Sequence, residues 1–355
     1  FLMLFFLFNF IACETFLQDI DHSNSSIGNK FHQRYSILKT YDEHSSIIIY
    51  LCGMSSLEEC TTTLETSTIS QIAERTRSIV YCLEHRFYGK SLPFPDISPE
   101  SLQYLNVDQA IDDVGSFASY LQTYKCFDQK CRVLLVGEGY SGSIAVWTKQ
   151  QYPDLIDSVW AISAPLSASN SYDSKEIYHS SILDAYFPDC MDSVSINMKK
   201  ISDQFILGNT TYIDQVYQYF NITNEVFPIE KNVLYAMSNF IYDLIDLWMA
   251  SDLNSLDKYC TNLDTNNFIS NTKSALDNLS KTLSDYNPTW KTDQVDAKLR
   301  NKHLQSYQYC TELGWIPVST PLYYIKRILP FSINSNYVSE NICFPLYNTT
   351  FKSRN

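Results

Sequence analysis

Residues 133–146 read Val-Leu-Leu-Val-Gly-Glu-Gly-Tyr-Ser-Gly-Ser-Ile-Ala-Val, an apolar run that passes through small residues into a helical pattern. This pattern is typical of the nucleophile elbow G-x-S-x-G, the sharp strand-to-helix turn that carries the attacking serine in many hydrolases. The first glycine of the motif closes the strand, and here that residue is Gly137. The nucleophile position is therefore Gly139, which has no side chain, and Ser141 falls where the motif requires a small residue.

The composition of the whole chain limits its fold and partners. With 355 residues, the chain is long enough for one large domain with an insertion or for two domains. Its formal net charge of −13 argues against nucleic acid and against an anionic membrane surface as partners. No C-x-x-C pair or histidine cluster predicts a metal site, and no cofactor is expected. Peptides or a protein ligand stay open as partners, and nothing in the sequence fixes an oligomeric state.

The N-terminal run from Phe1 to Cys13 is apolar, too short to span a bilayer, and followed by polar sequence. This is typical of the apolar part of a secretory signal with cleavage near Ala12 or Cys13. We interpret residues 1–13 as a signal peptide that is clipped, because the chain begins with Phe rather than Met. The alternative is an N-terminal membrane anchor. No other stretch reaches spanning length.

A secreted protein is expected to form disulfides and to carry glycans. The chain has ten cysteines, and nine remain without Cys13, so one thiol is left free or pairs outside the chain. Cys126 and Cys131, which flank a short loop before the key strand, are the pair we predict, and the other pairings stay open. Five glycosylation sequons are expected at the surface, at Asn24, Asn209, Asn221, Asn278 and Asn348.

The first half of the chain alternates apolar strands with amphipathic helices, which predicts a parallel sheet covered on both faces. Ligand sites in such sheets lie beyond the carboxyl ends of the strands, where the elbow is located. Strands are expected at 47–51, 79–83, 133–136 and 158–162, and helices at about 57–75, 107–121 and 140–150. From about Ser169 the pattern is helical without clear strands, and the best apolar stripe, which we interpret as core, comprises Val233, Met237, Phe240, Ile241, Leu244 and Trp248.

Several segments together resemble one known family of serine peptidases. The most specific is Leu-Glu-His-Arg-Phe-Tyr-Gly-Lys-Ser at 83–91, and Phe-His-Gln-Arg-Tyr at 31–35 and Tyr-Gln-Tyr-Cys-Thr-Glu at 307–312 add to it. The elbow at 137–147 and the segment 152–165 match the same family. The chain resembles the family of lysosomal Pro-Xaa carboxypeptidase, dipeptidyl peptidase II and thymus-specific serine peptidase over most of residues 31–315.

The resemblance implies an α/β-hydrolase with a mostly parallel sheet and an inserted helical cap domain, which cleaves beside proline with a Ser-Asp-His triad. It implies a first hydrolase segment at 31–168, a helical cap at 169–303 and a return to the hydrolase domain at 304–355. A secreted or lysosomal location is expected from the family and the signal-like N-terminus.

The resemblance assigns the serine of the family to Gly139, in agreement with the register of the strand. It also implies two oxyanion-hole donors, the backbone N–H of Tyr140 and the loop that contains Gly53. This loop reads Cys-Gly-Met at 52–54 where the family carries Gly-Gly-Glu, so both a glycine and a carboxylate are replaced. We favour a structural role for Glu84, His85 and Arg86.

The acid and the histidine of the triad lie near the C-terminus in the family, in two segments that the chain does not contain before it stops at Asn355. We therefore expect the hydrolase domain to lack its C-terminal strands here, and we interpret this as an incomplete record. Only His179 and His303 follow the elbow, and we expect His303 to be a surface residue rather than a catalytic base.

These observations favour a catalytically inactive member of the family, because Gly139 cannot attack a carbonyl. The first alternative is an active serine peptidase that uses Ser141, with its Asp and His in an unrecorded C-terminal segment. A sequencing or gene-model error at position 139 is the second alternative.

Overall fold

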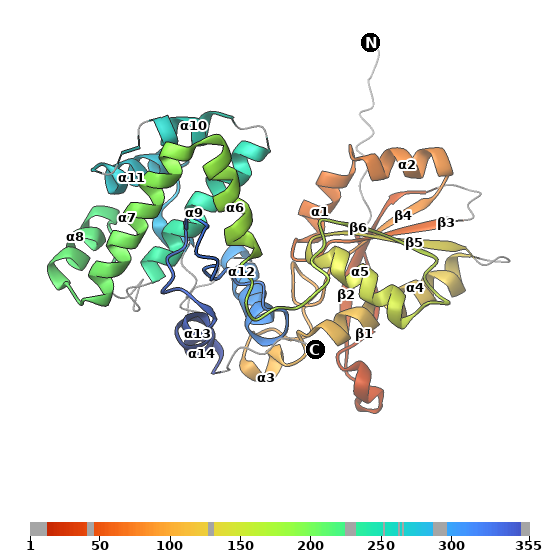
Figure 1. Ribbon diagram of the computed structural model, residues 1–355. Helices are drawn as coiled ribbons and strands as arrows, with labels where there is room; N and C mark the ends of the chain where they lie inside the picture. Colours follow the sequence, from red (N-terminus) through yellow and green to blue (C-terminus); the bar gives the residue numbers. More distant parts are fainter. Residues whose placement is uncertain are drawn as a thin grey trace, which may run out of the picture. The chain divides into compact units, whose positions relative to one another are not determined.

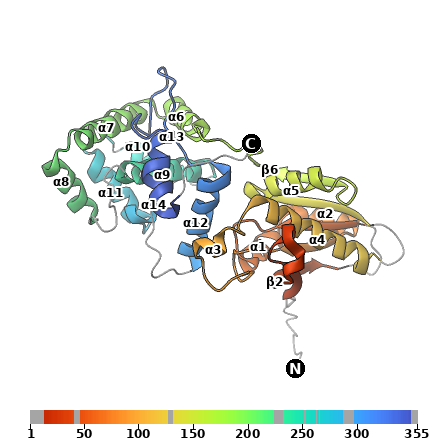
Figure 2. The same cartoon turned by 90° about the horizontal axis from the view of Figure 1, so that it is seen from below.

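The structure is a computed structural model that describes residues 13–40, 46–126, 131–223, 232–250, 253–261, 263–264, 266–286 and 297–348. The chain divides into two compact units. The sheet unit comprises Phe1–Ser167 and Val295–Gln308, and the helical unit comprises Ala168–Gln294 and Tyr309–Asn355. Figures 1 and 2 show the strands in the first unit and an all-helical arrangement in the second.

The sheet unit contains six strands in the order β1-β2-β4-β3-β5-β6 (Figure 1). The four adjacent strands β4, β3, β5 and β6 are parallel, as predicted. Helices connect β3 to β4, β4 to β5 and β5 to β6, which is the kind of connection that parallel strands need. β1 and β2 precede them in the chain and are antiparallel. The strands are β1 (Cys13–Asp19), β2 (Lys30–Lys39), β3 (Ser46–Leu51), β4 (Ile79–Leu83), β5 (Arg132–Glu138) and β6 (Ser158–Ile162).

Helices cover both faces of this sheet. Alternate residues of the central strands, such as Ile48 and Val80, pack against Leu57 and Leu64 from the helices on one face. Tyr81 points to the other face, where its ring contacts Phe117. The helices of this unit are α1 (Leu57–Leu64), α2 (Thr68–Thr76), α3 (Pro99–Leu102), α4 (Val107–Lys125), α5 (Tyr140–Gln151) and α12 (Ala297–Gln308), with a 3₁₀ segment, η1 (His22–Ile27). This sheet, with its order and helices, is an α/β-hydrolase fold.

The predicted helix at about 57–75 is two helices. Ser67 lies between them in an extended conformation, and its side chain accepts a hydrogen bond from the N–H of Ser70. A serine in this conformation caps the start of a new helix. Its cap therefore begins α2 a few residues after α1 ends at Leu64.

The helical unit packs around α9 (Asn232–Met249), whose apolar stripe is core as predicted: Val233, Met237, Phe240, Ile241 and Leu244 have no measurable exposure. Trp248, the sixth residue of the predicted stripe, is partly buried and packs against this core. A buried carboxylate, Glu176, accepts hydrogen bonds from the backbone N–H groups of Ile328 and Leu329. The elements are α6 (Ser174–Tyr186), α7 (Pro188–Ile206), α8 (Thr210–Phe220), α9 (Asn232–Met249), α10 (Leu253–Thr261), α11 (Phe268–Asn278), η2 (Leu283–Tyr286), η3 (Tyr309–Leu313), α13 (Ser335–Val338), η4 (Ser339–Cys343) and α14 (Phe344–Tyr347).

The two compact units differ in their bounds from the segments expected from the sequence. Residues 1–12 of the expected signal peptide lie outside the described residues, and Cys13 is the first residue of β1. The segment 304–355 was expected to return to the hydrolase domain. Here Val295–Gln308 belongs to the sheet unit and Tyr309–Asn355 to the helical unit.

Four disulfides account for eight of the ten cysteines. Cys126 and Cys131, the pair expected from the sequence, are joined. The remaining thiols are Cys13, which is exposed, and Cys82, which is buried in β4, so the odd cysteine is an internal free thiol. The other disulfides are Cys52–Cys60, Cys190–Cys260 and Cys310–Cys343.

Candidate active site

The elbow lies between β5 and α5, with Gly139 as the single residue between strand and helix. Gly139 has φ 56° and ψ −124°, a conformation that glycine adopts without the strain that a Cβ would bring. Its N–H donates to the carbonyl of Ile162 at 2.9 Å, and its carbonyl accepts from the N–H of Ser143 at 3.1 Å. A Cβ placed on Gly139 would have no other heavy atom within 4 Å. The apex of the elbow is therefore an open, sharply turned backbone without a side chain.

The two other glycines of the elbow allow the strand and the helix to approach each other. A Cβ on Gly137 would lie 2.4 Å from the carbonyl carbon and oxygen of Ser141. A Cβ on Gly142 would lie 2.8 Å from the Cβ of Ala164. Such separations are too short for any side chain, so both positions require glycine for steric reasons.

Ser141, the alternative nucleophile, is buried with 5% of its surface exposed. Its Oγ donates to the carbonyl of Glu138 at 2.9 Å and accepts from the N–H of Glu138 at 3.0 Å. Both functions of the hydroxyl are thus used by the backbone of the preceding turn. This arrangement favours the packing role that we expected for Ser141.

The expected oxyanion-hole residues lie together in the sheet unit. Tyr140 is the first residue of α5, so its N–H is at the helix N-terminus. The loop 52–54 follows β3, and a Cβ on Gly53 would lie 3.1 Å from the Cβ of Ser141. Gly53 has φ 60°, which also favours glycine. The loop therefore lies directly against the elbow.

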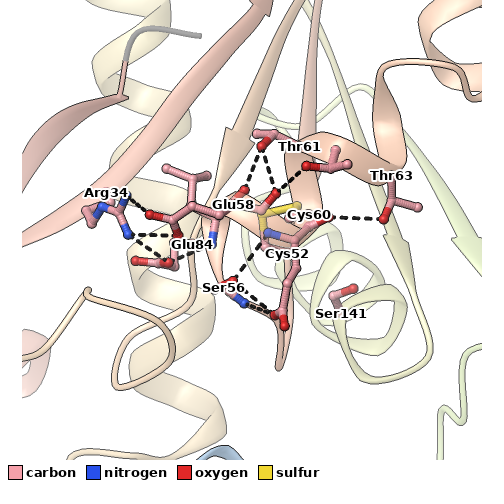
Figure 3. Close-up of a disulfide and its surroundings, with 12 residues drawn as sticks. Arg34, Cys52, Ser56, Glu58, Cys60, Thr61, Thr63, Glu84 and Ser141 are labelled. Atoms are coloured by element: carbon pink, nitrogen blue, oxygen red, sulfur yellow. Dashed lines mark hydrogen bonds and ion pairs between the residues drawn. A yellow bond between two sulfur atoms is a disulfide. The ribbon is translucent and has the colours of Figure 1, made fainter. Parts of the chain in front are cut away.

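The loop 52–54 is fixed to the sheet unit by two contacts of Cys52 and continues into the start of α1 (Figure 3). The N–H of Cys52 donates to the carbonyl of Leu83 at 3.0 Å, and the Cys52–Cys60 disulfide joins the loop to α1. Ser56 begins α1 with a capping box in which its side chain and that of Glu59 each accept a backbone N–H. These contacts restrict the backbone that would form one side of an oxyanion hole.

Glu84 holds the start of α1 and the turn that follows β4. Its carboxylate is fully buried and accepts from the N–H of Leu57 at 2.7 Å, from the N–H of Lys90 at 3.1 Å and from the Oγ of Ser91 at 2.7 Å. Arg34 lies 3.4 Å from the same carboxylate (Figure 3). A carboxylate at a helix N-terminus is favourable, and this one also joins three backbone segments.

Arg86 occupies a buried ionic cluster on the other side of the same motif. Its Nε and Nη2 donate to the two carboxylate oxygens of Asp113 at 2.7 and 2.6 Å. Burial alone would raise the pKa of Asp113, but Arg86 and His22 outweigh it and hold that pKa below its usual value. Nη1 also donates to the carbonyls of Ile20 and Tyr104 at 2.9 and 3.1 Å. The cluster ties η1 and α4 to the sheet.

His85 connects the motif to the elbow through a chain of hydrogen bonds. Its Nδ1 lies 2.7 Å from the carbonyl of Arg86, which can only accept, so Nδ1 carries the proton and Nε2 accepts from the Tyr140 hydroxyl at 3.1 Å. Gln308 of α12 donates to the Tyr140 hydroxyl at 2.8 Å and accepts from the hydroxyl of Tyr88 at 2.7 Å. Burial lowers the pKa of His85 to about 4, so the ring is neutral near pH 7. These contacts favour the structural role expected for Glu84, His85 and Arg86.

The two histidines that follow the elbow differ in their surroundings. His179, in the helical unit, pairs with Asp246 at 2.9 Å. The expectation that His303 is a surface residue is wrong: only 5% of its surface is exposed. His303 lies on α12 one residue before Leu304, which is buried among Phe87 and Tyr88, so helix packing covers a segment that looks polar in sequence.

Sequence reasoning missed the contribution of α12 to the site. Asn301 and Gln308, seven residues apart and so on one face of the helix, contact Met54 of the loop and Tyr140 of the elbow. The Tyr-Gln pair of the 307–312 segment was a signal for this, but its partners are more than 150 residues away in the chain.

The part of the chain that the structure describes contains no cluster of three or more histidine, cysteine or acidic side chains able to hold a metal ion. In the same residues, no helix is both long and apolar enough to cross a membrane. All five sequon asparagines, Asn24, Asn209, Asn221, Asn278 and Asn348, are exposed, as expected.

Residues 18–355 match the model of the serine carboxypeptidase S28 family. The chain is 29% identical to the lysosomal Pro-X carboxypeptidase of Bos taurus over 50% of this chain and 37% of that protein. It is 24% identical to the serine protease vicPb of Bipolaris victoriae over 79% of this chain and 53% of that protein.

Among solved structures, the chain is similar to an alpha/beta hydrolase from Novosphingobium aromaticivorans, with 10% identity, a TM-score of 0.31, and coverage of 50% of this chain and 57% of that one. This chain spans about a third of the length of several of the curated relatives that it matches. By the family match over residues 18–355, the chain belongs to the serine carboxypeptidase S28 family.

Proposed function

We propose that this chain is a member of the S28 family without serine-nucleophile activity, and that it binds peptides instead of cleaving them. The observation that carries this proposal is Gly139. It occupies the elbow between β5 and α5 with the required backbone turn and no hydroxyl. Acyl transfer by this family of folds needs an attacking oxygen at that point. The loop 52–54 lies against the elbow at Ser141, which leaves both segments in place for binding.

The alternative nucleophile Ser141 would first have to leave its present hydrogen bonds. Its Oγ both donates to and accepts from the backbone of Glu138, and the side chain is buried. A general base acts only when it reaches the hydroxyl directly or through one water. Activation at Ser141 would thus break two part-buried hydrogen bonds to the backbone of Glu138, each worth about 0.5–1.5 kcal/mol.

We propose further that the sheet unit is the hydrolase domain and that the helical unit corresponds to its inserted cap. We also propose a secreted or lysosomal location. Four disulfides and five exposed sequon asparagines support it, because disulfides persist in oxidising compartments. Detection of N-glycans on the protein purified from its own cells tests this location, and a reduced, unglycosylated protein would contradict it.

The activity part of the proposal is tested with a fluorophosphonate probe and with proline-containing peptide substrates. The protein should show neither labelling nor cleavage. Labelling that disappears in a Ser141→Ala variant would overturn the proposal in favour of an active Ser141. Labelling that persists in that variant would place a nucleophile elsewhere and would also overturn it. Direct sequencing of the protein around position 139 excludes an error at that residue.

A further inference from the structure

A pocket of about 240 Å³ lies beyond the end of β1 in the sheet unit. Its two walls come from residues 19–29 and 94–104, and they include Asn24, Phe94 and Tyr104. β1 is four strand positions from β5 in the sheet, which is about 19 Å at the usual strand spacing. The pocket is therefore a site apart from the elbow.

One buried guanidinium, that of Arg86, fixes both walls of this pocket. Its Nη2 donates to the carbonyl of Asp19 at 3.1 Å, on the first wall. Its Nη1 donates to the carbonyl of Ile20 on the same wall at 2.9 Å and to that of Tyr104 on the second wall at 3.1 Å. Because the walls are already held together, a ligand loses little free energy in ordering them.

The lining combines an aromatic surface with hydrogen-bonding side chains. The rings of Phe94 and Tyr104 stack with their centroids 5.4 Å apart, and both side chains are half-buried. Asn29, Glu100 and Gln103 are exposed and line the same pocket. An aromatic surface suits the apolar C–H face of a sugar ring, and carboxylate and amide oxygens accept hydrogen bonds from its hydroxyl groups.

Two further carboxylates of the lining, those of Asp19 and Asp21, already have partners. Asp19 pairs with Lys30 at 2.8 Å. Asp21 accepts from the N–H and the hydroxyl of Ser23 and from the Nε2 of Gln109. A cationic ligand gains most from a carboxylate that has no other partner. The pocket therefore favours a neutral ligand with hydroxyl groups over an amine.

Asn24 supplies the source of such a ligand. It is exposed in η1, lines the pocket and begins the sequon Asn-Ser-Ser at 24–26. In the attachment, its Nδ2 replaces the diphosphate of a lipid-linked oligosaccharide at C1 of the first sugar and releases a proton. A sugar tethered so closely has an effective concentration in the millimolar range or above, so weak contacts are enough to hold it. Pockets for drug-sized ligands have roughly 300–1,000 Å³, so this smaller one suits a single ring.

We propose that the pocket beyond β1 holds the first N-acetylglucosamine of a glycan attached to Asn24. The sugar joins residues 19–29 to residues 94–104 and shields its own bond to the asparagine. This inference rests on the proposed secretory location, and it adds that the glycan at this sequon is held by the fold. The other four sequon asparagines line no part of this pocket and serve as internal references.

Digestion of the native protein with a peptide-N-glycosidase tests the inference on the full chain expressed in its own cells. The enzyme hydrolyses the bond between asparagine and the first sugar and leaves an aspartate, which mass spectrometry counts at each sequon. It acts only while the sugar is out of the pocket, so occupancy in about nine molecules of ten slows release about tenfold. Release from Asn24 should be slower by this factor or more than release from Asn209 and Asn278, and similar after denaturation. Equal native rates, or a bare Asn24 beside glycosylated sequons, would overturn the inference.

Tyr104→Ala removes part of the aromatic surface and should raise the native rate at Asn24 toward that of the other sequons. Gln103→Ala, at an exposed position, should raise it in part, and it serves as the test if Tyr104→Ala does not fold. Tyr124→Ala is the matched control, because Tyr124 is an exposed aromatic residue of the same unit outside the pocket, and it should leave the rate unchanged. Release that stays slow in both pocket variants would assign the protection to the turn of η1 and overturn the inference. A protein without glycan at any sequon would contradict the secretory location as well, so the two failures are distinguishable.

Discussion

Replacement of Gly139 by alanine tests whether the elbow is an open turn whose only obstacle to a side chain is its backbone conformation. The dihedral angles of φ 56° and ψ −124° are unfavourable for any residue with a Cβ. No heavy atom lies within 4 Å of the position that the Cβ would take. The expected cost is therefore conformational and contains no steric contribution from neighbouring residues.

The change in the free energy of unfolding caused by Gly139→Ala follows from two opposing effects. Holding a residue other than glycine in such a conformation costs about 1–3 kcal/mol. Loss of the flexibility of glycine in the unfolded chain returns about 0.4–1 kcal/mol. The net loss in the free energy of unfolding should be about 1–2 kcal/mol for Gly139→Ala and similar for Gly139→Ser. Gly137→Ala should cost more than about 3 kcal/mol, because its Cβ would lie 2.4 Å from the backbone of Ser141.

Urea denaturation of the three variants, followed by circular dichroism, gives these free energies. Gly208→Ala is the matched control, because Gly208 has φ 66° and equally open surroundings but lies far from the elbow in sequence. The reasoning is refuted if Gly139→Ala is as destabilising as Gly137→Ala, since position 139 would then be sterically closed. A cost much below that of Gly208→Ala would also contradict it, because the turn would then not be under its stated constraint.

Three further predictions concern the interior of the sheet unit. The pKa of His85 is about 4 in the folded protein and 6.5 in the unfolded reference, so the unfolded chain binds more protons between these pH values. The free energy of unfolding should therefore fall by up to about 3 kcal/mol as the pH drops from 6.5 to 4. The His85→Gln variant should lose this part of the pH dependence in denaturation experiments. Without reductant, a thiol reagent should modify Cys13 in the native protein and reach Cys82 only after denaturation, since burial raises the pKa of Cys82 to about 12; modification of both at once would argue against the buried thiol. Glu84→Gln should cost about 2–4 kcal/mol in urea denaturation, because an amide cannot accept from all the donors around that carboxylate, and a loss below about 0.5 kcal/mol would disprove the structural role.

The sequence predicted those features that depend on local patterns. Apolar runs of four to five residues located the four parallel strands, and the register of β5 placed Gly139 at the elbow position, where the structure has it. β1 and β2 were not predicted. Gln33 is buried in β2 next to exposed residues, and a buried polar side chain hides the alternation by which strands are recognised.

Features that depend on contacts between distant segments were not predicted. α12 reads as a polar helix, and its lysines and asparagine gave no reason to expect that His303 and Leu304 are buried. Leu304 is buried because it packs against residues 87–105, about 200 positions earlier in the chain. The same holds for the Cys52–Cys60 disulfide, because nine cysteines permit many pairings and only the folded positions of β3 and α1 select one.

At the elbow, the strand-to-helix turn is a separate property from the presence of a nucleophile, although a motif search treats the two as one. Its turn is maintained by Gly137 and Gly142, which permit close backbone contact, and by Ser141, whose hydroxyl binds the backbone of Glu138 in both directions. None of these contacts involves the side chain at position 139. The strand-to-helix turn can therefore persist with glycine at its apex, because the packing of α5 on the sheet requires it whether or not a nucleophile is present. A preserved elbow consequently identifies the fold, whereas our proposal that the chain lacks serine-nucleophile activity rests on the side chain that Gly139 does not have.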